Sequence, residues 1–116
     1  MTVKAGLLEK QGKQEEADKM YDEAIATANI NQLNNLGYQM VAGNRLDKAI
    51  EYFALNVKRN PNDPNVYDSL GEAYKMNGDE KNAIKNLKKS LSLDPPANVK
   101  ANSLRLLKEM GVEYES

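Results

Sequence analysis

The 116-residue sequence contains neither cysteine nor histidine. Without cysteine there are no disulfides, thiolate metal sites or cysteine nucleophiles. Without histidine the chain lacks the side chain that most often transfers protons near neutral pH, which is also the commonest zinc ligand. The sequence also shows no glycine-rich phosphate loop and no S-x-x-K motif. We therefore expect a protein that is not an enzyme and that needs no metal or other cofactor.

The sequence also lacks an excess of one charge and any long apolar run. It has 16 basic and 17 acidic residues, which leaves a net charge of −1. No broad basic surface is available for phosphates, so we expect no nucleic-acid partner. No segment is apolar over the length that crosses a bilayer, and no signal-peptide pattern opens the chain. We expect a soluble protein, whose compartment the sequence does not indicate.

The sequence repeats itself with a period of 34 residues. The pair Leu36-Gly37 recurs at this distance as Leu70-Gly71. Three more pairs of like residues share the same offset, namely Ala49 with Ala83, Phe53 with Leu87, and Pro61 with Pro95. Coincidences at one fixed offset indicate a repeat architecture in which each unit is one supersecondary element.

The repeated residues resemble the tetratricopeptide repeat, a helix–turn–helix unit of about 34 residues with the pattern W-x2-L-G-x2-Y…A-x3-F…P. The matching residues are Leu33, Leu36, Gly37, Ala49, Phe53 and Pro61 in one repeat, and Tyr67, Leu70, Gly71, Tyr74, Ala83 and Pro95 in the next. A first repeat is degenerate, because Ala17 and Tyr21 align with Ala49 and Phe53 two residues short of the period. The resemblance implies an all-α fold, a right-handed α-solenoid of about three helix hairpins plus a C-terminal capping helix.

We expect a single domain over residues 1–116, made of a degenerate repeat (1–29), two full repeats (30–63 and 64–97) and the capping helix (98–111). Helices are predicted near residues 2–11, 14–28, 31–43, 46–59, 64–77, 80–93 and 98–110. Asp63 before Pro64 is a favourable helix start, because the carboxylate accepts hydrogen bonds from free amides and proline fits the first helical position. Gly43, Gly78 and Gly111 are predicted to leave their helices in the left-handed conformation.

The resemblance also implies a binding surface, because family members usually bind a peptide or helix on a concave side formed by the first helix of each pair. Once the packing positions are removed, polar residues recur at steps of three and four on these helices. The candidate peptide-binding residues are Asn31, Asn34, Asn35, Tyr38, Asn65, Asp68, Ser69, Glu72 and Lys75. Asparagine offers a donor and an acceptor for a peptide backbone. The alternative is an ordinary solvated helix face.

Chaperone-binding members of the family hold the terminal carboxylates of a peptide with a clamp of lysines, an arginine and asparagines. Asn35 matches one clamp asparagine, but Thr2, Gly6, Asn65 and Ser69 stand where the other clamp residues belong. Without cations the charge-assisted hydrogen bonds have no donors. The sequence therefore excludes this clamp and predicts a neutral or basic ligand.

Two functions are compatible with these features. The first is a non-catalytic interaction module that binds a peptide or a partner domain on its concave face. The second is a structural appendage of an enzyme, because the run from Asn65 to Tyr74 (N-V-Y-D-S-L-G-E-A-Y) resembles the tetratricopeptide tail of some bacterial serine hydrolases of the β-lactamase and esterase type. In that case the partner would be a catalytic domain of the same parent chain, and this chain would carry no catalytic residue.

Overall fold

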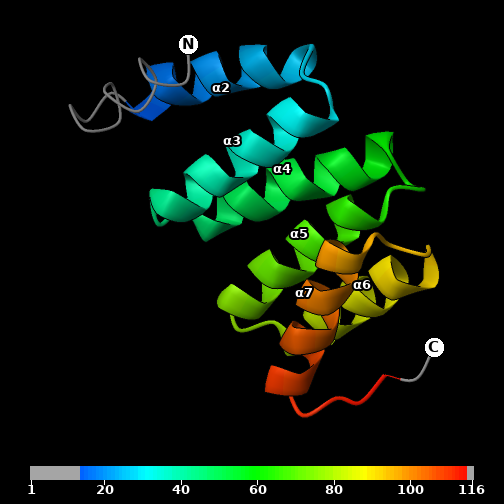
Figure 1. Cartoon of the computed structure of the whole chain (residues 1–116). Helices are drawn as coiled ribbons and strands as arrows, with labels where there is room; N and C mark the ends of the chain where they lie inside the picture. The colour runs from blue at the N-terminus through cyan, green and yellow to red at the C-terminus, as the bar shows by residue number, and fades with distance from the viewer. Residues whose placement is uncertain (1–13, 115–116) are drawn as a thin grey trace.

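The structure, a computed structural model, describes residues 14–114 as six helices without a strand in that range. The helices are α2 (Gln14–Ala26), α3 (Ile30–Ala42), α4 (Leu46–Arg59), α5 (Pro64–Met76), α6 (Glu80–Ser92) and α7 (Ala97–Glu109). They lie stacked in chain order (Figure 1). The predicted all-α helical-repeat solenoid is confirmed. The helix predicted near residues 2–11 lies outside the described residues.

The helices form two layers. The pairs α3–α4 and α5–α6 are antiparallel hairpins, α4 packs against α5, and α7 packs against both α5 and α6. Because α3 contacts α5 and α5 contacts α7, these three helices form one continuous inner layer, and α4 and α6 form the outer layer. No helix in the described range is both long and apolar enough to cross a membrane.

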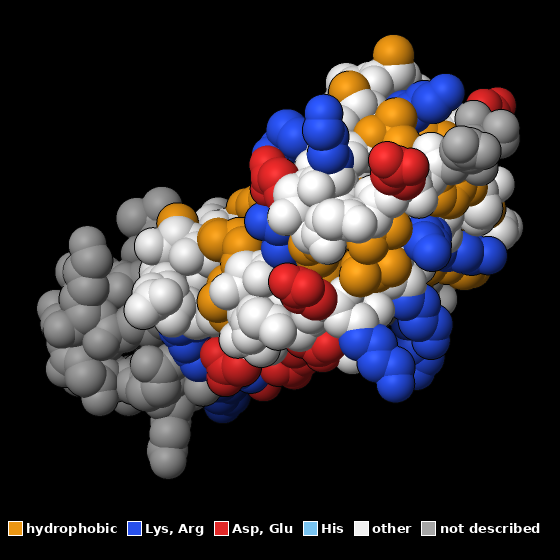
Figure 2. All heavy atoms as spheres, turned by 90° about the horizontal axis from the view of Figure 1, so that it is seen from below, with side chains coloured by type: hydrophobic (Ala, Val, Ile, Leu, Met, Phe, Trp, Pro, Cys, Tyr) orange, Lys and Arg blue, Asp and Glu red, His pale blue; other side chains and the backbone are white. Residues whose placement is uncertain are grey.

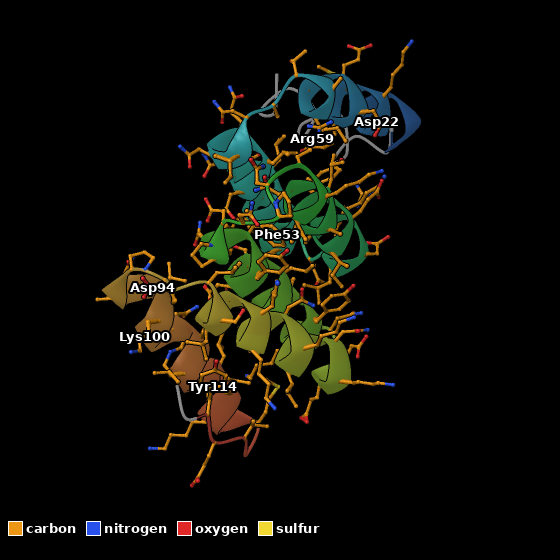
Figure 3. The ribbon with its side chains drawn as sticks, turned by 90° about the vertical axis from the view of Figure 1, so that its right-hand side faces the viewer. Asp22, Phe53, Arg59, Asp94, Lys100 and Tyr114 are labelled. Atoms are coloured by element: carbon orange, nitrogen blue, oxygen red, sulfur yellow. The ribbon has the colours of Figure 1, made fainter. Side chains whose placement is uncertain are left out.

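Two glycines allow the helices of each hairpin to approach closely. A Cβ atom added to Gly37 would lie 2.2 Å from Cε1 of Phe53, which sits in the middle of the stack (Figure 3). A Cβ atom added to Gly71 would lie 2.7 Å from Cγ of Leu87. Both distances are far below van der Waals contact, so no larger residue fits without displacing the facing side chain. The 34-residue repeat of glycine is therefore a packing requirement.

The helix ends agree with the sequence in most places. The side chain of Asp63 accepts a hydrogen bond from the amide of Asn65, as predicted for the start of α5. Gly78 and Gly111 have φ angles of 81° and 76°, in the left-handed region. The prediction for Gly43 is wrong, because its φ is −84° and the left-handed residue is its neighbour Asn44, with φ 60°. Asparagine tolerates this conformation because its short polar side chain makes local hydrogen bonds.

Candidate functional site

The inner layer is held together by polar contacts between side chains about one repeat apart. The Ser69 hydroxyl of α5 donates a hydrogen bond of 2.7 Å to Oδ1 of Asn34 on α3. The Tyr38 hydroxyl lies 3.3 Å from the Ser69 hydroxyl and donates to Glu72 at 3.2 Å. Burial raises the pKa of Tyr38 to about 12, and the nearby Glu72 carboxylate adds to the rise. Four candidate binding residues thus contact one another across α3 and α5.

A similar contact joins α5 to α7. The two carboxylate oxygens of Asp68 accept hydrogen bonds from Asn102 at 2.8 Å and from Ser103 at 2.6 Å. Asp68 is only 5% exposed, and burial raises the pKa of its carboxyl group above the ordinary value despite these two donors. Asn34 and Asp68 occupy the same position of the 34-residue repeat, and each accepts a hydrogen bond from a serine 35 residues later.

An ion pair extends the contact between α5 and α7 to their C-terminal ends. Lys75 lies 3.0 Å from Oε1 of Glu109, and Arg105 lies 2.8 Å from Oε2 of the same carboxylate. The hydrogen bonds from Lys75 and Arg105 lower the pKa of Glu109. Because Glu109 is exposed, this pair contributes little to stability. It does hold the Lys75 ammonium group at the edge of the inner layer.

The nine candidate residues therefore differ in accessibility. Asn31 and Asn35 are exposed, and so is Tyr38 to 38%, although the Tyr38 hydroxyl itself lies against Ser69 and Glu72 and is shielded from solvent. Those at intermediate exposure are Asn34, Asn65, Glu72 and Lys75. Asp68 and Ser69, at 5% and 1%, are buried between helices. The structure thus places these two candidates away from solvent, hydrogen-bonded to side chains of a neighbouring repeat, and a role of the nine residues in binding stays a prediction.

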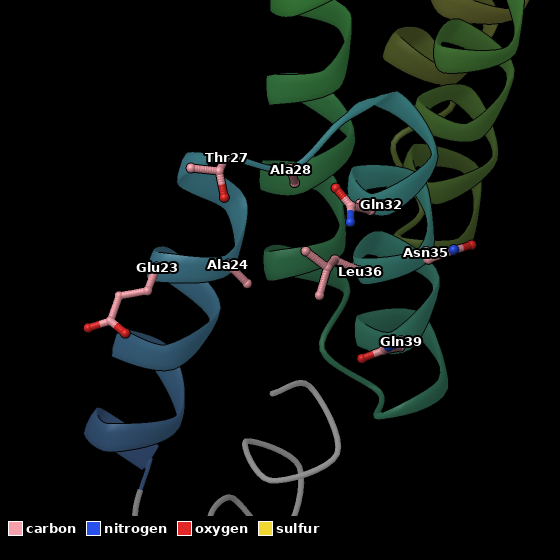
Figure 4. Close-up of a pocket in the computed structure, with 8 residues that line it drawn as sticks. All are labelled: Glu23, Ala24, Thr27, Ala28, Gln32, Asn35, Leu36 and Gln39. Carbon is pink, nitrogen blue, oxygen red and sulfur yellow. The ribbon is translucent and has the colours of Figure 1, made fainter.

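A hollow of about 450 Å³ lies beside Asn35, between α2 and α3 (Figure 4). It is lined by Glu23, Ala24, Thr27 and Ala28 of α2 and by Gln32, Asn35, Leu36 and Gln39 of α3. Sequence reasoning missed Gln32 and Gln39. The sequence could have indicated them through their spacing from Asn35, because positions 32, 35 and 39 share one side of a helix. In Figure 4 the side chains of Gln32 and Gln39 lie on the side of α3 that faces α2, whereas the Asn35 side chain points away from α2 at the edge of the hollow.

Sequence reasoning also missed the contribution of α7 to the inner layer. Asn102 and Arg105 belong to this helix, for which the sequence pattern predicts a capping role rather than a place in the inner layer. The 34-residue period contains the signal, because adding one period to Asp68 leads to Asn102 and adding one to Lys75 leads to Glu109. Both of these pairs are in direct contact.

The chemistry of this surface is that of hydrogen bonding. Among the side chains that the structure describes, no three carboxylates, histidines or cysteines converge in a way that could hold a metal ion. The accessible groups are carboxamides, one phenol and a few paired charges. Such groups bind polar backbones and amides through hydrogen bonds.

Comparison with known proteins agrees with this architecture. Residues 64–96, which comprise α5, α6 and the turn after them, match the sequence model of the tetratricopeptide repeat. The chain therefore contains at least one tetratricopeptide repeat within an all-α helical stack. Domains of this kind generally mediate contacts between proteins and are generally non-catalytic.

Three similar proteins extend the likeness to just over half of the chain. Cellulose synthase operon protein C of Escherichia coli K12 is 41% identical over 70 residues, which cover 59% of this chain and 6% of that protein. The putative cellulose synthase operon protein C of E. coli O157:H7 matches to the same extent. Tetratricopeptide repeat protein 36 of Caenorhabditis elegans is 34% identical over 65 residues, 56% of this chain and 36% of that protein. The matched region is thus a small part of each E. coli protein and about a third of the worm protein.

Proposed function

We propose that this chain is a non-catalytic interaction module that binds an extended peptide, or such a segment of a partner domain, beside α3. The observation that carries the proposal is the hollow between α2 and α3, whose wall contains Gln32, Asn35 and Gln39. The carboxamides of Gln32 and Gln39 face the hollow about 10 Å apart along the helix, with Asn35 at its edge, and they offer donors and acceptors to the alternating groups of an extended backbone. The general role of tetratricopeptide repeats in protein contacts supports the same conclusion.

The charges around the hollow favour a neutral or basic ligand. Its one charged lining residue is Glu23, and none of its lining residues is a lysine or arginine. On the neighbouring stripe, Glu72 is half-buried beside Tyr38. A peptide carboxylate would be desolvated here without a cation to compensate, which costs affinity. A peptide with neutral or basic side chains meets no such penalty.

The proposal can be tested with an array of neutral and basic decapeptides, followed by NMR titration of the chain with the best binder. Changing Asn35 and Gln39 together to alanine should weaken binding about tenfold, because each lost hydrogen bond is worth about 0.5–1.5 kcal/mol. Both side chains are exposed, so the melting curve should stay nearly unchanged. Lys58→Ala on the outer layer is the matched control and should bind normally.

Two results would contradict this proposal. The first is chemical-shift changes confined to outer-layer residues such as Lys48, Lys58 and Lys85, which would indicate docking through the opposite side. The second is the absence of binding by every peptide in the array, which would leave a spacer role. The titration distinguishes these outcomes because it reports on each residue separately.

The alternative function is a structural appendage of a serine hydrolase, suggested by the resemblance of residues 65–74 to the tail of such enzymes. Most of that stretch is buried, including Val66, Tyr67, Leu70 and Ala73. Helix packing therefore explains most of the residue types in this stretch without a catalytic partner. The test is an NMR titration with any hydrolase domain encoded upstream in the same reading frame. Submicromolar binding to that domain would favour the appendage, and no shifts would reject it.

A further inference from the structure

The outer surface of α6 carries a group of unpaired lysines. Lys81, Lys85, Lys88 and Lys89 are all exposed, and their spacing places them along one side of the helix. None of them forms an ion pair with a carboxylate in the described part of the chain. On the face seen in Figure 2, lysine and arginine side chains lie at several places, most of them in the half of the molecule away from the residues drawn in grey. We call these four residues the lysine surface.

The lysine surface borders a hollow with an aromatic floor. A depression of about 430 Å³ is lined by Tyr67, Lys85, Asn86, Lys88 and Lys89. The Tyr67 hydroxyl donates a 2.7 Å hydrogen bond to the carbonyl oxygen of Pro61, which fixes the ring, and the Lys89 ammonium group lies 6.0 Å from the ring centroid. The lysine surface therefore offers the Tyr67 ring as an apolar contact, with lysine ammonium groups around it.

The fold does not require these lysines. Subtracting one period of 34 residues from their positions leads to Asp47, Glu51, Ala54 and Leu55 on α4. The same outer side of the preceding repeat is thus acidic or apolar, although both helices pack in the same way. Lysines four residues apart on one helix also repel each other, so the cluster costs the free protein stability. Helix packing therefore does not explain it.

We propose that the lysine surface binds an acidic segment of another protein, with carboxylates on the ammonium groups and an apolar side chain against Tyr67. The lysines from position 81 to position 89 span about 12 Å, which matches carboxylates placed one or two helical turns apart. Tyr67 is only 8% exposed, so the accessible part of its ring suits contact with an aliphatic side chain better than stacking with a nucleic-acid base. The net charge of −1 and the acidic helix α2 also oppose a long polyanion. This proposal concerns the outer layer and does not depend on the proposed function of the inner layer.

The test uses the full chain and a 15-residue peptide rich in glutamate with one central leucine, titrated at low ionic strength. A second peptide with glutamine in place of glutamate is the probe control. Binding should require the glutamates, weaken as salt rises and shift the NMR signals of α6. The double variant Lys85→Glu with Lys88→Glu should lose at least about tenfold in affinity. The leucine-to-serine peptide should bind more weakly, because the contact with Tyr67 is lost.

The matched control is the double variant Lys19→Glu with Lys58→Glu, which changes the net charge equally at two exposed lysines outside α6. It should bind the acidic peptide within about twofold of the original chain. Equal losses in both double variants would show attraction by net charge alone and would overturn the proposal. Equal affinity for a DNA duplex or for phosphatidylserine vesicles, lost through the same lysines, would overturn it too. Lys85→Gln with Lys88→Gln keeps the test valid if the glutamates disturb folding.

Discussion

The hydroxyl of Ser90 donates a hydrogen bond of 2.8 Å to the carbonyl oxygen of Pro64, which is 26 residues earlier. The side chain of Asn56 makes the equivalent bond of 3.0 Å to the carbonyl oxygen of Ile30, at the same separation. Each bond joins the end of an outer helix to the first residue of its inner partner. Both donors are fully buried, so these bonds are isolated from water. The hairpins are therefore closed by side chains as well as by apolar packing.

We predict that Ser90→Ala destabilises the fold by about 1–3 kcal/mol, the cost of leaving a buried polar group without its donor. Ser92→Ala in the same helix should stay within about 0.5 kcal/mol, because Ser92 is exposed and its hydroxyl donates to the carbonyl oxygen of Lys89 within the same helical turn. Urea unfolding monitored by circular dichroism measures both. Equal midpoints for the two variants would show that the bond to Pro64 contributes nothing.

Gly71→Ala should destabilise the fold by about 1–3 kcal/mol, although alanine is the better helix former. The added methyl group would lie 2.7 Å from Leu87 Cγ and 3.2 Å from the backbone oxygen of Ala83. The control is Gly43→Ala, where the nearest atom is 3.4 Å away and φ is negative, so we expect a change within about 0.5 kcal/mol. A Gly71 variant as stable as the control would contradict the close helix approach.

The charge on Asp68 should make stability depend on pH. Burial raises the pKa of its carboxyl group, so the folded state holds this proton more tightly than the unfolded state does. The resulting stabilisation is complete below the ordinary carboxyl pKa and is lost as pH rises through the raised value. Asp68→Asn cannot titrate. The original chain should therefore gain stability relative to this variant between about pH 7 and pH 4. If the difference in unfolding free energy between the original chain and Asp68→Asn stayed constant over this pH range, the raised pKa of Asp68 would be refuted.

The hydroxyl of Tyr38 on α3 contacts two residues of α5. Tyr38→Phe removes its contacts with Ser69 and Glu72 and should cost about 0.5–1.5 kcal/mol. Tyr74→Phe is the control, because the Tyr74 hydroxyl makes no hydrogen bond within the described residues, and it should cost less.

The same pair of variants reports the ionisation of this phenol. In an absorbance titration, the difference between the original chain and Tyr38→Phe should show a phenol with a pKa near 12. Since this value lies above the ordinary one, its stabilisation is present below about pH 10 and declines as pH rises toward 12. Ionisation near pH 10 in a chain that circular dichroism shows to be folded would argue against burial of the hydroxyl.

The sequence predicts most of the fold because residues that pack between helices recur every 34 residues. Glycine at positions 37 and 71 indicates where helices meet, and Asp63-Pro64 marks a helix start correctly. The left-handed residue after α3 escaped prediction because Asn44 replaces the expected Gly43. Asparagine serves both as a surface residue and as a helix terminator, so its presence does not distinguish the two roles.

The candidate site is harder to predict, because spacing does not separate a solvated polar residue from one paired across helices. Asp68 and Glu72 lie on the same polar stripe, yet the first is buried and the second is not. The difference depends on Asn102 and Ser103 of α7, which are more than 30 residues away in the chain. Only the arrangement of α3, α5 and α7 shows which polar side chains are already hydrogen-bonded within the protein.

The bonds of Asp68 to α7 also make the repeats non-interchangeable. If residues 64–97 were duplicated in tandem, the position one period after the first Asp68 would hold a second aspartate instead of Asn102. Two carboxylates would then meet in a buried site, and one would have to take up a proton or turn away. The apolar contacts would tolerate the extra copy, because they repeat. A second copy of α5 would therefore be a poor replacement for α7 at this position of the stack.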